Sequence, residues 1–151
     1  MGNPPKLNTK GLKMAKSTKT PLELFFSDSV RWAKCRAKKD GIVFDSRITP
    51  TFLEGMFKGQ NGLCGLTGQR MELTRGGDWY GKDGKGGKNP MVASIDRKYP
   101  ALGYTLDNIH LACTKWNTLK GDMDIVTWFT MCQNGASHST LQLLDKQGWQ
   151  G

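Results

Sequence analysis

The chain has 151 residues, of which 37% are hydrophobic and 23% are charged, and its net charge is +9 at neutral pH. This length and composition are typical of one globular domain and exclude an intrinsically disordered chain. No apolar run is long enough to cross a membrane and the lysine-bearing N-terminus lacks the apolar core of a secretory signal, so we expect a cytoplasmic protein with no membrane partner. The positive charge favours a polyanionic partner, most commonly nucleic acid.

The four cysteines are far apart in the sequence, at Cys35, Cys64, Cys113 and Cys132. None belongs to a Cys-x-x-Cys pair, which is the usual spacing of zinc-binding cysteines. We therefore expect no structural zinc and four thiols that stay reduced.

Residues 1–19 contain five lysines and two prolines but no acidic residue. They are predicted to form a flexible basic N-terminal arm, which either contacts phosphates or is a solvated tail. Residues 20–151 are then predicted to form a single domain.

A helix is predicted from Pro21 to Asp40. Thr20 is a candidate N-cap, Pro21 fits the first helical position, Glu23 completes a capping box, and Gly41 ends the helix. Apolar residues recur at helical spacing on one face. The later turns carry basic residues that either follow a phosphate backbone or are simply solvated: Arg31, Lys34, Arg36, Lys38 and Lys39.

A second short helix is predicted to begin at Thr49-Pro50 and to end at Gly59, and residues 62–73 predict a small hairpin. The Gly-rich segment 76–88 either follows a nucleic-acid groove or is a surface insertion. Its basic residues are candidate phosphate contacts: Lys82, Lys85 and Lys88.

Two short strands and a helix are predicted in the central segment. The first strand spans residues 93–97, the second ends at Cys113, and the helix contains Asn117. Asp96 and Asn117 would then offer a carboxylate and an amide oxygen, which suit Mg²⁺ (or Mn²⁺) in a single-metal phosphodiesterase site. Lys120, three residues after Asn117, is expected on the same helical face, where it would contact a phosphate.

A last set of signals follows the central segment. Asp122 or Asp124 is expected to cap a further helix through about Gln133. Its inward face is predicted to consist of four residues: Ile125, Trp128, Phe129 and Cys132.

Three ordered motifs resemble one family: Ser-Ile-Asp-Arg (94–97), Gly-Tyr-Thr-x-Asp-Asn-Ile (103–109) and Asn-x-x-Lys-Gly-Asp (117–122). Together they resemble the HNH endonucleases with the ββα-metal fold, in the branch common in bacteriophage genomes. The resemblance covers about residues 24–133. It implies an α+β fold with the ββα-metal motif at about residues 91–121 inside a small helical domain. It also implies a location in the host-cell cytoplasm if the chain is phage-encoded.

The resemblance also assigns roles to individual residues. Asp96 and Asn117 would be the metal ligands, and hydrogen bonds of Asn108 would hold the loop between the strands. In many HNH enzymes a histidine that acts as general base follows the Asp, but here the residue is Arg97. Arginine stays protonated and cannot be that base, although it can bind the scissile phosphate. The base would be His110, a metal-bound hydroxide or Tyr99.

The resulting hypothesis is a metal-dependent DNA endonuclease that nicks or cuts by phosphodiester hydrolysis. A catalytically impaired, HNH-derived DNA-binding protein is the alternative, consistent with the missing histidine. A basic RNA-binding protein is the third hypothesis, but it leaves Asp96 and Asn117 without a role. A homodimer would suit double-strand cutting, although no motif indicates an interface.

Overall fold

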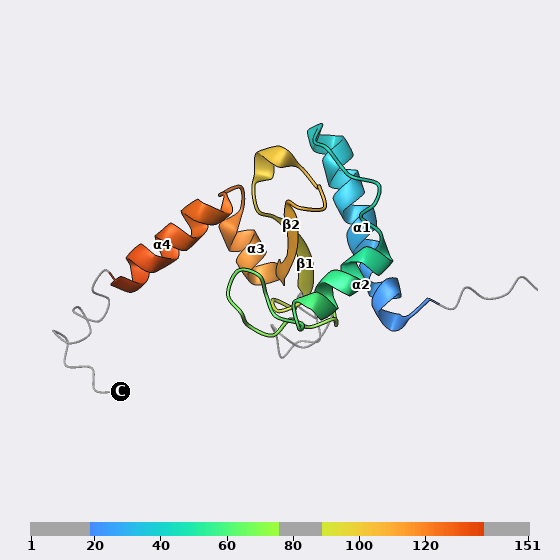
Figure 1. Cartoon of the computed structure of the whole chain (residues 1–151), viewed down its shortest axis with the longest axis horizontal. Helices are drawn as coiled ribbons and strands as arrows, with labels where there is room; N and C mark the ends of the chain where they lie inside the picture. The colour runs from blue at the N-terminus through green and yellow to red at the C-terminus, as the bar shows by residue number, and fades with distance from the viewer. Residues whose placement is uncertain (1–18, 76–88, 138–151) are drawn as a thin grey trace, which may run out of the picture.

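The computed structural model describes residues 19–75 and 89–137, which form an α+β fold. Most of the predicted arm (1–19) and the lysines Lys82, Lys85 and Lys88 lie outside these residues. Figure 1 shows the antiparallel strands β1 and β2 between the pair α1–α2 and helix α3, with α4 projecting away. The elements are α1 (Pro21–Asp40), α2 (Pro50–Gly59), β1 (Ala93–Arg97), the 3₁₀ helix η1 (Pro100–Leu102), β2 (Ile109–Cys113), α3 (Thr114–Lys120) and α4 (Ile125–Ser137).

Helix α1 has the predicted ends. The Thr20 side chain accepts a hydrogen bond from the Glu23 N–H, and the Glu23 carboxylate accepts one from the Thr20 N–H, which completes the capping box. Gly41 ends the helix in the left-handed conformation, with φ of 66°. One face packs into the core through Phe26, Val30, Ala33 and Ala37. The helix therefore presents its charged residues to solvent and to the cavity described below.

Hydrogen bonds tie the start of α1 to α2. Thr49 caps α2 by accepting a hydrogen bond from the Phe52 N–H, as predicted. Glu54 of α2 accepts hydrogen bonds from Lys58 Nζ at 2.6 Å and from Thr20 Oγ1 at 2.8 Å. The Lys58 contact and then the Thr20 contact hold the pKa of Glu54 below its ordinary value. Thr20 is thus both a cap and a link between two helices.

The two strands pair in a register that places Asp96 opposite His110 and Ala93 opposite Cys113. Helix α3 begins at Thr114, immediately after β2. The predicted hairpin at 62–73 is reduced to a single bridge between Leu63 and Arg70. The turn of this segment lies against β2, because the Gly65 N–H donates a hydrogen bond to the Leu111 carbonyl at 2.9 Å.

The two buried cysteines, Cys64 and Cys113, meet where this turn packs on β2. The Cys113 N–H donates a hydrogen bond to Cys64 Sγ at 3.2 Å. Burial, together with the neighbouring Cys64, raises the pKa of the Cys113 thiol to about 12. At neutral pH this thiol is therefore protonated and acts as a packing group.

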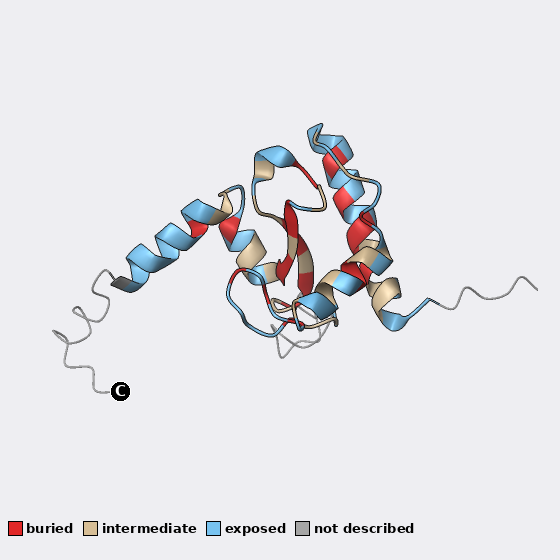
Figure 2. Cartoon of the chain, viewed as in Figure 1, coloured by how far each residue is buried: buried red, intermediate tan, exposed pale blue. Residues whose placement is uncertain are grey.

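The end of helix α4 and its buried face both differ from the prediction. The helix extends to Ser137 rather than to about Gln133, with Asp124 as the cap that accepts hydrogen bonds from the N–H groups of Val126 and Thr127. Trp128 is buried, but Phe129 is 43% exposed and Cys132 is also exposed, so the predicted inward face was wrong after the first turns. Figure 2 shows the physical reason, which is that most of α4 extends beyond the body of the fold. None of the described helices is long and apolar enough to cross a membrane.

We expect Thr20→Ala to lower the free energy of unfolding by about 1–2 kcal/mol, because the N-cap hydrogen bond and the hydrogen bond to Glu54 are both lost. Chemical denaturation followed by circular dichroism measures this change. Thr20→Ser retains the hydroxyl and is the matched control, which should stay close to wild type. Equal losses in both variants would contradict a stabilising role of the Thr20 hydroxyl.

Candidate active site

The Asp96 carboxylate is the centre of the site. It is 3% exposed, and each of its oxygens has a partner. His110 Nε2 lies 2.7 Å from Oδ2, and Lys120 Nζ lies 3.0 Å from Oδ1. A carboxylate oxygen can only accept, so Nε2 is the donor in the first contact. The strand register and the last turn of α3 bring these two partners to Asp96.

Lys120 lies in a different place from the one predicted. Its side chain is fully buried, and Nζ also donates a hydrogen bond to the Arg97 carbonyl at 2.9 Å. The reason is that α3 follows β2 without a loop and packs on the strands. Its last turn therefore brings Lys120 to the Asp96 carboxylate. In this arrangement Lys120 has no direct access to a phosphate. Its ammonium instead compensates a buried charge.

Asn117 is fixed by hydrogen bonds from its amide nitrogen. Nδ2 donates to Ser94 Oγ and to the Ile95 carbonyl, both at 3.0 Å. Because a carbonyl can only accept, the Ile95 contact determines which amide atom is nitrogen. Among the described residues no hydrogen bond uses Oδ1, so this oxygen remains available as an acceptor or a metal ligand.

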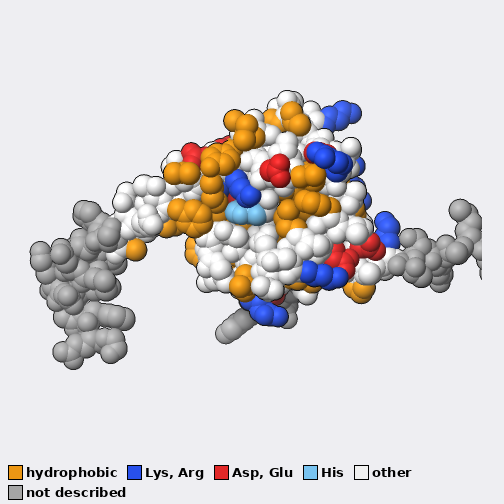
Figure 3. Space-filling view, in the orientation of Figure 1, with side chains coloured by type: hydrophobic (Ala, Val, Ile, Leu, Met, Phe, Trp, Pro, Cys, Tyr) orange, Lys and Arg blue, Asp and Glu red, His pale blue; other side chains and the backbone are white. Residues whose placement is uncertain are grey.

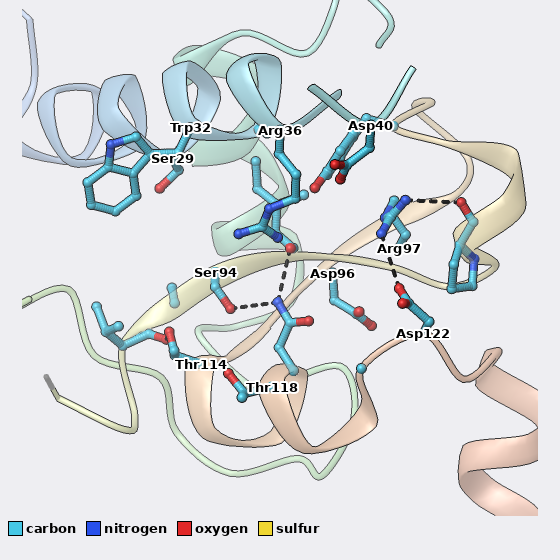
Figure 4. Close-up of a pocket in the computed structure, with 18 of the residues that line it drawn as sticks. Ser29, Trp32, Arg36, Asp40, Ser94, Asp96, Arg97, Thr114, Thr118 and Asp122 are labelled. Atoms are coloured by element: carbon cyan, nitrogen blue, oxygen red, sulfur yellow. Dashed lines mark hydrogen bonds and ion pairs between the residues drawn. The ribbon is translucent and has the colours of Figure 1, made fainter. Parts of the chain in front are cut away.

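Asp96 and Asn117 line the same cavity, which has a volume of about 720 Å³. Figure 4 shows it between α1, which carries Trp32, Arg36 and Asp40, and the opposite wall formed by β1 and α3. The volume is in the range of small-molecule binding sites. The site therefore has the space that a substrate group would need beside Asp96.

The oxygen atoms of Asp96 and Asn117 fit a hard divalent cation. A carboxylate and an amide oxygen are the ligands that Mg²⁺ prefers, with water and substrate phosphate in the remaining positions. Within the described residues no group of three or more His, Cys, Asp or Glu side chains could hold a metal ion. The chain would thus supply only part of the coordination shell. The carboxylate oxygens retain lone pairs beside the contacts to His110 and Lys120.

Asn108 makes the hydrogen bonds expected of it. Its Nδ2 donates to the Tyr99 carbonyl at 2.8 Å and to the Gly103 carbonyl at 2.7 Å, and its Oδ1 accepts from the Tyr99 N–H at 3.0 Å. Gly103 has a φ of 68°, and a Cβ there would lie 2.6 Å from the Val43 carbonyl oxygen. Asn108 and Gly103 therefore fix the turn that follows Arg97.

Arg97 lies at the cavity with weak partners. Its Nη1 donates to the Pro100 carbonyl at 3.1 Å, and its Nη2 is 3.6 Å from Asp122, whose side chain is 91% exposed. The guanidinium carbon lies 5.1 Å from the centre of the Tyr104 ring. An ion pair with so exposed a partner contributes little, so Arg97 could exchange it for a phosphate.

His110 differs from the expectation for a general base. Its Nε2 is bound to Asp96, and a Cβ added at Gly65 would lie 2.5 Å from its Nδ1. The cavity is lined by Asp96, Arg97 and Asn117 but not by His110 or Tyr99. The geometry therefore favours His110 as a group that positions Asp96. Sequence reasoning missed Gly65, whose lack of a side chain leaves room for the imidazole.

The basic residues of α1 do not act as one surface. Arg36 lines the cavity, whereas Lys34 points its Nζ at the Phe44 ring, 5.5 Å from its centre. Lys38 and Lys39 are exposed but do not line the cavity. Figure 3 likewise shows Lys and Arg side chains as separate groups between hydrophobic and acidic ones on the face in view. On this face the positive charge does not form a single patch.

A scan against protein-family models and searches of curated proteins and of solved structures find no match to this chain. The argument about function therefore depends on the residues and their geometry. Of the predicted residues, His110 and Lys120 contact the Asp96 carboxylate, Arg97 and Asn117 line the same cavity, and Asn108 holds the adjacent turn. Sequence reasoning did not identify Ser94, which orients Asn117, or the cavity-lining Trp32.

We expect Lys120→Met to lower the free energy of unfolding by about 3 kcal/mol, because it leaves the buried Asp96 carboxylate without its ammonium partner. The double variant Asp96→Asn/Lys120→Met removes both charges and should recover most of this loss. Urea denaturation of the two variants measures the difference. Lys115→Met, an exposed lysine on the same helix, is the matched control. A Lys120→Met variant as stable as that control would contradict the buried ion pair.

Proposed function

We propose that the chain is a metal-dependent DNA endonuclease in which β1, β2 and α3 form an HNH-like ββα-metal motif. The observation that supports this most is the placement of Asp96 and Asn117 on one cavity wall. The two residues come from different elements, and each is oriented by further hydrogen bonds. The net charge of +9 favours the same polyanionic substrate.

Asp96 and Asn117 would hold one Mg²⁺ or Mn²⁺ ion, which would stabilise the negative charge that develops on the phosphate. The chain's own residues prepare the site for it. Lys120 and His110 hold Asp96 from two sides, and Ser94 holds Asn117. Both ligands are thereby oriented before substrate binds, which reduces the cost of ordering them during the reaction.

Arg97 would bind a non-bridging oxygen of the scissile phosphate. Its planar guanidinium suits two hydrogen bonds to phosphate, and it stands next to Asp96 at the end of β1. The Asn108 hydrogen bonds hold the turn that follows Arg97. Arg36 from α1 faces the same space and would contact a neighbouring phosphate.

One observation favours the second candidate function, a DNA-binding protein that does not cut. Lys120 Nζ already lies 3.0 Å from Asp96 Oδ1, so an ammonium neutralises the carboxylate that would hold the metal. A protein that only binds DNA would need no ion there. The two functions differ in whether divalent ions change activity and DNA affinity.

We expect the purified protein to nick supercoiled plasmid with Mg²⁺ or Mn²⁺ and not with a chelator. Asn117→Ala should reduce nicking at least about a hundredfold, since it removes a ligand whose contribution to the transition state is electrostatic. Thr118→Ala, which changes the neighbouring cavity residue on the same helix, is the matched control and should cut normally. Thermal unfolding with and without an excess of Mn²⁺ that fills even a weak site gives a second readout, in which wild type but not Asn117→Ala should be stabilised.

No nicking with any metal, together with salt-sensitive DNA binding that is the same in wild type and Asn117→Ala, would contradict the endonuclease. It would support the non-cutting DNA-binding function instead.

We expect His110→Gln to retain much more nicking activity than His110→Ala. A glutamine amide can still donate a hydrogen bond to Asp96, whereas alanine cannot, and neither can act as a base near neutral pH. Gly65→Ala should resemble His110→Ala, because its new Cβ displaces the imidazole. Plasmid nicking rates across pH 6–9 measure the effect. Equal and complete loss in both His110 variants would favour the general base instead.

A further inference from the structure

A stack of side chains lies at the end of the cavity away from Arg97. Trp32 of α1 is 51% exposed, and the Arg75 guanidinium carbon lies 4.7 Å from the centre of its ring. The same guanidinium lies 4.1 Å from the Phe25 ring. Arg75 Nη2 also donates hydrogen bonds to the Phe25 carbonyl at 2.9 Å and to Ser29 Oγ at 2.8 Å. Arg75 is therefore held in place, and its guanidinium supports the ring of Trp32.

Packing of the hydrophobic core does not explain this stack. A tryptophan whose purpose is packing is normally far less exposed, and Arg75 has no carboxylate in hydrogen-bond contact among the described residues. Trp32 and Arg75 both line the cavity that contains Asp96 and Asn117. An exposed aromatic ring fixed by a guanidinium is a surface on which a planar group can stack.

The position of Trp32 relative to Asp96 indicates which kind of planar group would stack on the Trp32 ring. Trp32, Arg36 and Asp40 lie on successive turns of α1, spaced by about 6 Å. Figure 4 shows Trp32 at one end of this row and Asp40 and Arg97 at the other, with Asp96 between them on the opposite wall. The row therefore offers an aromatic surface, then the Arg36 cation, and ends at the Asp40 carboxylate. Its first two members follow the order in which a nucleotide presents its base and its phosphate.

We propose that Trp32, supported by Arg75, stacks on the unpaired base next to the scissile phosphate, so that the substrate is DNA without base pairing at the cutting position. This inference rests on the proposed endonuclease function and names its substrate class. In a regular duplex the base faces are covered by neighbouring pairs, and a tryptophan can stack only on a base that is single-stranded or displaced. Single strands, flaps and branched junctions all provide such a base.

Binding without cleavage tests the subsite separately from the nuclease. Fluorescence anisotropy in the presence of chelator compares a labelled single-stranded DNA oligonucleotide with its fully paired duplex and with single strands that carry one abasic position. Trp32→Ala should weaken binding to the single strand about tenfold, which is typical for loss of one base–aromatic stack, and Trp32→Phe should retain most of the affinity. The duplex should show little change in either variant.

Two comparisons make the result specific. Phe129→Ala removes an exposed aromatic residue that does not line the cavity, and it should bind all oligonucleotides as wild type does. An abasic site at the stacked position should weaken DNA binding by wild type, because the base that makes the contact is absent. It should leave the affinity of Trp32→Ala unchanged.

Three outcomes would overturn the proposal: equal affinity of wild type and Trp32→Ala for the single strand, the same loss on the duplex, or a loss that no abasic position reproduces. A base-dependent contact that is present with RNA of the same sequence and absent with DNA would overturn the assignment to DNA. If base-dependent DNA binding is found but no metal produces nicking, the subsite stands and the nuclease fails.

Discussion

One buried carboxylate organises the middle of this molecule. Asp96 on β1 meets His110 from β2 and Lys120 from α3, so three elements converge on two oxygen atoms. A shift of the strand register by one residue would turn Asp96 to the opposite face and leave the Lys120 ammonium buried without a partner. The charge pair therefore selects one register and one position of α3. The same selection places Asn117, three residues before Lys120, against Ser94 and Ile95.

The cavity follows from how α1 packs over this centre. The small and apolar residues of α1, such as Ala33 and Ala37, approach the core, while Trp32 and Arg36 on an adjacent face border the open space. The start of α1 is tied to α2 by the hydrogen bond from Thr20 to Glu54. A ligand entering the cavity would meet side chains that already have hydrogen-bond partners, such as Asn117 and Arg75.

Local signals were sufficient to predict the ends of α1 and α2, because Thr20, Thr49 and Gly41 act on the backbone next to them. The closeness of Asp96 and Asn117 was also predictable, since a hairpin followed directly by a helix has few arrangements. The burial of Lys120 was not, because helical spacing gives a direction but not the depth at which the helix packs. The exposure of Phe129 was missed for a related reason, since periodicity identifies an apolar face and not whether anything covers it.

In the proposed endonuclease, the position of Lys120 would also affect how tightly the metal ion binds. An ammonium 3.0 Å from Asp96 cancels much of the negative charge that would attract a divalent cation. Asn117 is neutral, so the chain's two ligands alone would bind the ion weakly, and a DNA phosphate would have to supply the remaining charge and oxygen atoms. Binding of metal and of DNA would then be mutually dependent, and by linkage each would raise the affinity for the other by the same factor. Such a site would assemble fully only on its substrate, which limits the metal-bound protein to the places where it could cut.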